Sequence, residues 1–562
     1  MHSPTICRFF AVDLFVIIAC LVLTRATVQA GEAMPVTGLA PARHVPYLCR
    51  YHYPVLTTSQ ECQQFCDQGF GYFYSYVWME AARCFETALH HDPDCALAWL
   101  GLHRSLEKWG KGGTPLATPF LALAGIAWHP QLPKPFQRKA VDFALDQAQR
   151  LMPRSSDREQ LLIRARLEEK GWLPNIKPDD RKKKAQQTLD ELLTLYPEDQ
   201  EGWFARAQVA EGLHGKAPFY HALLRVNPLH PGANHELVHF FENIRRPALG
   251  WPYAEAYMAS SPGIPHAFHM QAHLAMRIGK WKQTSDWSSQ AIALEKAYHQ
   301  QAGVNPSDDH QFRHHLETLT RSLVHDGRFA EARSIQADAI GYKFEFRPEW
   351  FRMALAQQQW QEARQQVEAI RKRDKVLAAY FAAVLALEQH DVSTARAEID
   401  VLRQALQRNK TDKRAEQRFL EVQGWLLCQT GQSDAGIKLF RRLIEQTKDD
   451  YAHHAWGGGA LYMETWGIAA LEAGLSSEAD EAFQEALAHD TGSVRGALGM
   501  WALCERLGRT LEADRYLKLA RRCWERADPA DFDRLKATFA RRALHLSRPT
   551  VEGTASTPPA SP

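Results

Sequence analysis

Apolar residues along this chain recur at helical spacing, and small residues interrupt them at fixed intervals. The clearest example lies between residues 61 and 93, at Gly69, Tyr72, Ala81, Phe85, Ala88 and Pro93. The pattern returns near the C-terminus at Gly467, Ala479, Phe483 and Ala486, where the turn glycines Gly474 and Gly508 are 34 residues apart. No part of the chain alternates apolar and polar residues over any length, as a half-buried strand would. The sequence therefore predicts helices only.

A period near 34 residues predicts one pair of antiparallel helices per repeat. Small residues such as Gly69 and Ala81 let the two helices approach closely, and a large residue such as Phe85 fills the space between them. Because a helix with one apolar stripe cannot bury that stripe alone, the hairpins must stack on one another. Weaker copies of the turn occur at Gly279, Gly327 and Gly431. We expect about eight to ten hairpins between residues 57 and 545.

Composition divides the chain into segments. We expect N-terminal hairpins over residues 57–110 and a longer solenoid over residues 157–545. Between them, residues 111–156 predict an irregular connection rich in Gly and Pro, with a helix. A linker at residues 31–56 precedes the first hairpin. The tail at residues 546–562 has the Ser-, Thr- and Pro-rich composition of a disordered segment.

The first 30 residues have the features of an export signal. The apolar core from Leu14 to Leu23 is too short to cross a bilayer as a helix. Val28 and Ala30 are small residues at the positions preferred for cleavage, which would make Gly31 the first mature residue. We expect an exported protein, periplasmic or otherwise extracytoplasmic. The alternative is a chain anchored by an uncleaved signal.

The length and the net charge of the chain limit the classes of molecule that it is expected to bind. At 562 residues the chain exceeds what one core can organise, because single cores stop growing near ~250–300 residues. Lys and Arg number 67 against 65 Asp and Glu, so a strongly basic nucleic-acid binder is not supported. Beyond the N-terminal signal no run of ~20 apolar residues predicts a membrane span. A protein or peptide is the expected partner.

The cysteines gather near the N-terminus, at Cys49, Cys62, Cys66, Cys84 and Cys95. Three interpretations stay open for them. They are buried thiols in helix cores, partners in disulfides if the compartment is oxidising, or ligands of a zinc site that lacks the close knuckle spacing.

Taken together, the repeat pattern resembles that of tetratricopeptide-repeat (TPR) proteins. More narrowly, Phe65-Cys66-Asp67-Gln68-Gly69 and Asp92-Pro93-Asp94-Cys95-Ala96-Leu97-Ala98-Trp99 resemble the opening of a group of large, often exported bacterial TPR proteins. In that group Pro231-Gly232-Ala233 would precede a His-x3-His pair, although Gln271 and Ala272 replace the Pro and Ser expected in a later pair. The resemblance implies an all-α, TPR-type α-solenoid forming a right-handed superhelix. It implies no settled activity.

Thirteen histidines fall between His214 and His325. His235 and His239 are one helical turn apart and so share a helix face, and His269 and His273 repeat the arrangement one 34-residue period later. In the TPR register both pairs stand on the first helix of a repeat and face the concave groove. The same register also places five further residues on the first helices of these repeats and the next one: Glu242, His266, His314, Glu317 and Arg321.

Three functions fit this pattern. In the first, His266, His314, Glu317, Arg321 and Glu242 belong to a groove that binds a peptide or anion. In the second, His235, His239, His269 and His273 hold a Zn or Cu ion. In the third, His235-Glu236-Leu237-Val238-His239 matches the H-E-x-x-H motif, with Glu236 as general base of a metal-dependent hydrolase.

Binding is favoured over catalysis, because zincins need a sheet edge beside the motif and no strand is expected. The sequence therefore predicts an exported TPR scaffold that binds a protein or peptide segment in its concave groove. The alternative is a metal-binding protein or a metal-dependent hydrolase that uses the paired histidines.

Overall fold

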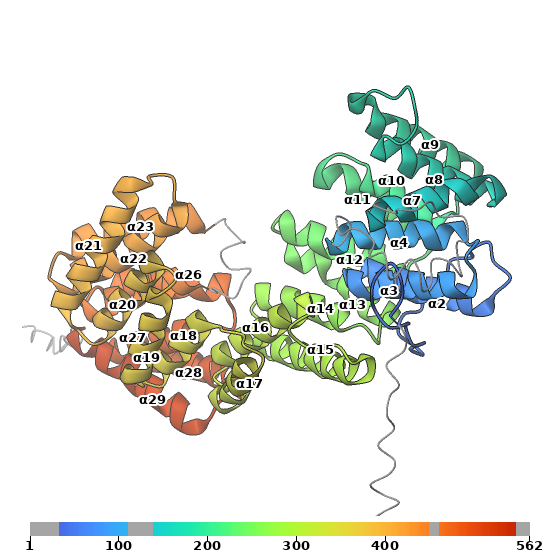
Figure 1. Ribbon diagram of the computed structural model, residues 1–562. Coiled ribbons are helices and arrows are strands. Elements are labelled where there is room, and N and C mark those ends of the chain that lie inside the picture. The colour runs from blue at the N-terminus through green and yellow to red at the C-terminus, as the bar shows by residue number, and fades with distance from the viewer. Residues whose placement is uncertain (1–32, 111–138, 449–459, 547–562) are drawn as a thin grey trace, which may run out of the picture. The chain divides into compact units, whose positions relative to one another are not determined.

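The computed structural model describes residues 33–110, 139–448 and 460–546 (Figure 1). These residues contain 25 α-helices and no strand. The predicted signal at residues 1–30, most of the Gly- and Pro-rich connection and the tail from residue 547 lie outside the described residues. Within the described part, no helix is long and apolar enough to cross a bilayer.

The helices of the N-terminal half are α2 (Gln60–Tyr74), α3 (Trp78–His91), α4 (Ala96–Trp109), α7 (Ala140–Leu151), α8 (Asp157–Lys170), α9 (Arg181–Leu195), α10 (Gln200–Gln208), α11 (Gly212–Val226), α12 (Pro231–Asn243), α13 (Trp251–Ser260) and α14 (Pro265–Arg277). Those that follow are α15 (Trp281–Ala302), α16 (His310–His325), α17 (Phe329–Gly341), α18 (Arg347–Ala356), α19 (Trp360–Arg371), α20 (Lys375–Glu388), α21 (Val392–Arg408), α22 (Lys413–Gln429), α23 (Ser433–Thr447), α25 (Leu461–Glu472), α26 (Ser476–His489), α27 (Val494–Arg506), α28 (Thr510–Cys523) and α29 (Pro529–Arg542). Short 3-10 turns are η2 (Met152–Arg154), η3 (Pro178–Asp180), η4 (Pro247–Gly250) and η6 (Ala543–His545).

Consecutive helices pack against one another in pairs, and in the second unit first helices contact the first helix of the next pair, as α12 contacts α14, α20 contacts α22 and α25 contacts α27. This packing confirms the predicted TPR-type α-solenoid. The described residues hold twelve pairs followed by α29, more than the eight to ten expected. The surplus arises where pairs such as α10 and α11 lack the glycine and alanine spacing that marks a repeat in the sequence.

Glycine ends several of the first helices, as the turn signals predict. Gly279, Gly327, Gly431, Gly474 and Gly508 all have positive φ, the left-handed conformation that side chains disfavour. Each lies between the two helices of a pair. The repeat turns predicted from the sequence are therefore confirmed at these positions.

Aspartates begin several helices by accepting a hydrogen bond from a backbone N–H of the first turn. Asp374 caps α20, Asp391 caps α21 and Asp412 caps α22 in this way. Such caps satisfy backbone donors that no helical carbonyl can reach.

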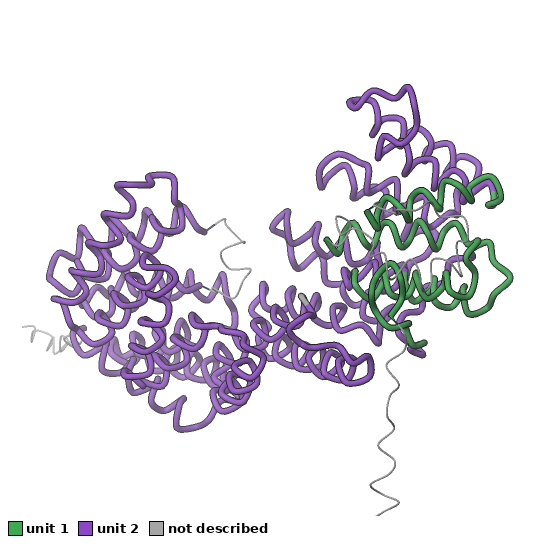
Figure 2. The backbone as a smooth tube through the Cα atoms, in the orientation of Figure 1, with its two compact units in different colours: residues 1–44, 55–69, 78–156 green, residues 45–54, 70–77, 157–562 purple. Residues whose placement is uncertain are grey.

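The chain folds into two compact units, shown in green and purple in Figure 2. Among the described residues, the first holds 33–44, 55–69, 78–110 and 139–156, and the second holds 45–54, 70–77, 157–448 and 460–546. Part of the predicted linker thus belongs to the second unit. There the buried Tyr51 and Tyr53 donate hydrogen bonds to Glu201 and Asp199.

Candidate functional site

Seven histidines of the second unit converge from three successive first helices. Helix α12 carries His235 and His239, helix α14 carries His266, His269 and His273, and helix α16 carries His314 and His315. These helices are neighbours in the stack, since α14 packs against both α12 and α16. The one-period shift between the His pairs therefore places their side chains on adjacent helices, as the register predicts.

One group of three consists of His235, His239 and His266. Each offers one ring nitrogen, and these atoms lie within 4.8 Å of one another. The Nε2 atoms of His235 and His266 are 3.0 Å apart. Tyr76, in the turn after α2, covers the group, with its ring centroid 4.4 Å from that of His235 and 5.8 Å from that of His239.

A second group of three consists of His269, His273 and His314, whose ligating atoms also lie within 4.8 Å of one another. The ring of His269 is 4.3 Å from that of His273 and 4.7 Å from that of His314, measured between centroids. The four histidines predicted as one metal site thus fall into two groups. Each group is completed by a histidine that the sequence assigned to the groove.

Glu242 lies between the two groups. Its carboxylate is 3.2 Å from Nδ1 of His239, 3.5 Å from Nδ1 of His273 and 2.8 Å from Nε of Arg277. Burial raises the pKa of Glu242, but hydrogen bonds from the two histidines and the charge of Arg277 outweigh it and hold that pKa well below its usual range. This carboxylate therefore stays ionised and anchors one imidazole of each group.

Burial makes these imidazoles neutral. The side chains of His235, His266, His269 and His273 are almost fully buried. Desolvation, followed for most of them by the charge of neighbouring histidines, lowers the pKa of each, and it lowers the pKa of His314 to about 2. Neutral imidazoles keep a lone pair for a proton or a metal. These four side chains are enclosed by the protein, whereas His239 and His314 are partly exposed.

The remaining predicted residues belong to neither group of three histidines. The Glu236 carboxylate accepts a hydrogen bond of 2.9 Å from the Tyr76 hydroxyl. The described residues contain no strand that could serve as the sheet edge of a zincin. Arg321 pairs with Glu317 at 3.3 Å and with Glu349 at 2.7 Å, and it belongs to a pocket in the C-terminal part of the solenoid.

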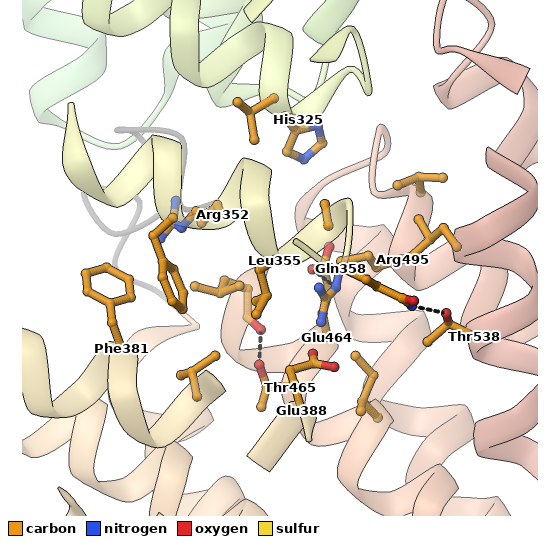
Figure 3. A pocket seen from close by; sticks show the side chains of 18 of the residues that line it. His325, Arg352, Leu355, Gln358, Phe381, Glu388, Glu464, Thr465, Arg495 and Thr538 are labelled. Atoms are coloured by element: carbon orange, nitrogen blue, oxygen red, sulfur yellow. Dashed lines mark hydrogen bonds and ion pairs between the residues drawn. The ribbon is translucent and has the colours of Figure 1, made fainter. Parts of the chain in front are cut away.

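That pocket has a volume of about 180 Å³ and is lined by α16, the first helices α18, α20, α22, α25 and α27, and by α29 (Figure 3). Its walls are aromatic and aliphatic, with charged groups that mostly pair among themselves. Arg495 pairs with Glu464 and Arg542 pairs with Glu388. Glu421, which accepts hydrogen bonds of 2.8 Å from Tyr380 and Thr465, was not singled out in the sequence because its neighbours come from other repeats.

The first unit holds a cluster of thiols. The sulfur atoms of Cys62, Cys66 and Cys95 lie within 4.8 Å of one another, and all three side chains are buried. All described cysteines are free thiols. Hydrogen bonds from Cys66 and Cys95 lower the pKa of the Cys62 thiol. Cys62 and Cys66 face Cys95, the residue before α4, across the helix pair.

No family model and no curated protein matches this chain. Among solved structures, this chain is similar to the crystal structure of the APC/C hetero-tetramer Cut9-Hcn1. The sequence identity is 13%, the match covers 81% of this chain and 76% of the other chain, and the TM-score is 0.30. The human IFIT1 dimer with m7Gppp-AAAA is 13% identical over 83% and 91%, with a TM-score of 0.27. Yeast Tom70 is 13% identical over 86% and 89%, with a TM-score of 0.24. Scores this low assign no family, so the fold rests on the helix packing described above.

Proposed function

We propose that this protein is an exported scaffold that binds a segment of another protein through the pocket between α18 and α29. One observation carries the proposal. A row of first helices binds α29, which is itself a helix, through side-chain contacts alone. Repeat solenoids commonly use the inner surface of such a row for protein recognition.

The contacts of α29 show how this surface recognises a helix. Thr538 accepts a hydrogen bond of 3.0 Å from Gln358, which follows α18. Arg542 pairs with Glu388 of α20, and Phe539 packs on Phe483, which comes from the second helix α26, with ring centroids 6.1 Å apart. Apolar anchors flanked by polar contacts are typical of helix recognition in a groove.

The free space beside α29 sets the size of the occupant. A volume of about 180 Å³ has room for ~6 water molecules, since each takes ~30 Å³ of liquid. A whole helix does not fit there, but one or two side chains do. The partner segment therefore lies across the mouth of the pocket and inserts side chains next to Phe381 and Leu355.

Arg352 selects the charge of that segment. It lies half-buried in the pocket wall (Figure 3). Within the described part of the chain it makes no hydrogen bond or ion pair, whereas Arg321, Arg495 and Arg542 in the same pocket are all paired. A carboxylate on the partner would neutralise Arg352 at low desolvation cost. The expected ligand is a peptide with an acidic residue beside apolar ones.

Peptide selection tests this proposal. Random linear peptides displayed on phage would be selected against the purified chain, and the enriched sequences synthesised and titrated. We expect acidic, apolar peptides that lose at least ~10-fold in affinity on Arg352→Glu, because a like charge replaces a charge-assisted hydrogen bond. Arg396→Ala, at an exposed position on the second helix α21, is the matched control and should change nothing.

Two outcomes contradict the proposal. In one, no peptide is enriched over an empty support. In the other, enriched peptides bind equally well to the Arg352→Glu variant, which would place their site elsewhere on the chain.

A further inference from the structure

We propose that His235, His239 and His266 form a mononuclear site for a divalent transition-metal ion of the zinc type, bound through their Nε2 atoms. This inference is independent of the peptide pocket. It differs from the site predicted from the sequence, because it takes His266 from the next helix in place of His269 and His273.

The three imidazoles already stand at nearly the separation that a metal requires. Zn–N bonds of about 2.0–2.1 Å in tetrahedral geometry place two ligand nitrogens ~3.3 Å apart. The Nε2 atoms of His235 and His266 are 3.0 Å apart, and a ring nitrogen of His239 lies within 4.8 Å of both ligand atoms. Small side-chain rotations would bring all three to one ion.

The opposite nitrogen of each ring is already engaged, which leaves Nε2 for the metal. Nδ1 of His235 donates to the backbone carbonyl of Tyr74 at 2.6 Å. Nδ1 of His239 donates to the carboxylate of Glu242 at 3.2 Å. Metal-bound histidines in proteins nearly always donate their other N–H to a carboxylate or a backbone carbonyl, because this fixes the tautomer and the ring orientation.

His266 reaches its carboxylate through a second histidine. Its Nδ1 is 3.4 Å from Nε2 of His315, and Nδ1 of His315 is 2.8 Å from the buried carboxylate of Glu295. With a metal on Nε2, the Nδ1–H of His266 donates to His315, and the Nδ1–H of His315 donates to Glu295. Each donor then meets an acceptor, and no lone pair faces another.

The site is also accessible from solvent, and its coordination sphere has an open position. The side chain of His239 is 30% exposed, while its Nε2 atom is buried and has no hydrogen-bond partner among the described residues. A three-histidine set leaves the fourth tetrahedral position for water or a ligand. Tyr76, with the unusual positive φ of 60°, holds its ring against all three imidazoles.

The second group offers an internal comparison. Nδ1 of His269 is buried and has no hydrogen-bond partner within the described ranges, so its ring orientation is not fixed by an acceptor. The group of His269, His273 and His314 therefore lacks the full support that the first group has. Alanine at His314 serves as the matched control.

Titration with Co²⁺ tests the site, using chain purified without a histidine tag. We expect about one equivalent of Co²⁺ with the intense visible bands of tetrahedral coordination, displaced by Zn²⁺. His239→Ala should weaken binding by on the order of 100-fold, and Glu295→Gln by roughly 10-fold through the loss of His266 orientation. His314→Ala should leave the bands and the affinity unchanged. Circular dichroism establishes that each variant is folded, and the exposure of His239 makes its replacement the safest for folding.

Three results overturn the proposal. Absence of Co²⁺ bands, together with a melting temperature that Zn²⁺ does not raise, means that the histidines form a hydrogen-bonded network only. Bands that persist in folded His239→Ala place the ion outside this group. Bands lost in His314→Ala and kept in His239→Ala assign the ion to the second group.

Discussion

At the scale of single residues, one phenylalanine ring connects three helices in the best-formed repeats. A Cβ on Gly69 would lie 3.0 Å from the Phe85 ring, and a Cβ on Gly101 would lie 2.5 Å from it. Gly467 and Gly499 stand in the same relation to Phe483, at 2.5 and 2.4 Å. The spacing of 16 residues on each side is identical in the two repeats. The glycines are therefore needed because the ring leaves no room for a methyl group.

Gly467→Ala should destabilise the protein by about 1–3 kcal/mol, because the new methyl group overlaps the Phe483 ring and overpacks the helix interface. Better helix propensity returns at most ~1 kcal/mol. Urea unfolding followed by circular dichroism measures the difference. Gly341→Ala is the control, since no atom lies within 4 Å of its Cβ and its φ is not positive. It should be neutral or slightly stabilising, and equal losses in both variants would contradict the packing argument.

Glu421 should make stability depend on pH in an unusual direction. Burial raises its pKa from 4.5 to about 7, although Thr465 and Tyr380 donate hydrogen bonds to it. The folded state therefore holds a proton that the unfolded state releases near pH 4.5. The resulting stabilisation is complete below that pH and is lost as the pH rises through about 7. At pH 8 the Glu421→Gln variant should be more stable than the natural chain by up to ~3 kcal/mol, because one pKa unit is worth about 1.4 kcal/mol.

Unfolding free energies of the two chains at pH 5 and pH 8 provide the measurement. The difference between them should grow with pH. A constant difference would mean that Glu421 does not retain its proton in the folded state.

At the scale of elements, α29 differs from the paired helices because no second helix follows it within the described residues. It packs against the first helices α25 and α27, and Phe532 and Phe539 are its buried aromatic side chains. Arg542 adds contacts to Glu388 and Glu472, and its guanidinium lies 5.9 Å from the centre of the Trp425 ring. These contacts are local to one face. Helix α29 can therefore be detached without unfolding the pairs beneath it.

Phe539→Asp should release α29, because an unpaired carboxylate cannot remain in the apolar site beside Phe483. Hydrogen exchange measured by mass spectrometry should show residues 529–546 exchanging much faster, with α18 to α23 unchanged. Leu544→Asp, at a position 62% exposed, is the control and should leave exchange as it was. Loss of protection throughout the solenoid would show instead that α29 is part of its core.

At the scale of the whole molecule, export is an expectation from residues 1–30, which lie outside the described residues. Expression of the complete gene in a bacterium should give an extracytoplasmic protein whose N-terminal sequence begins at Gly31. Ala30→Phe should block cleavage, because the peptidase requires a small residue there, and leave the chain attached to the membrane. A natural chain that retains Met1 in the membrane fraction would support the uncleaved anchor. A chain that stays in the cytoplasm would refute export.

The sequence by itself determined the helical class, the repeat period and the hairpin turns. These features depend on local rules, because a glycine with positive φ or a small residue facing Phe85 acts within one or two repeats. It also placed His235, His239, His269 and His273 on neighbouring helices. Pairs such as α10 and α11 were not predicted as repeats, because their packing uses residues without the glycine and alanine signature.

Tertiary structure alone decided how the histidines group. His266 joins His235 because α12 and α14 pack against each other, and Tyr76, His315 and Glu295 complete the surroundings from other segments of the chain. The position of α29 and the surroundings of Arg352 depend in the same way on packing between repeats. The repeat pattern predicts the helix face on which a side chain lies. The contacts between ring nitrogens depend on side-chain rotamers and helix packing, which the spacing of residues in the sequence does not predict.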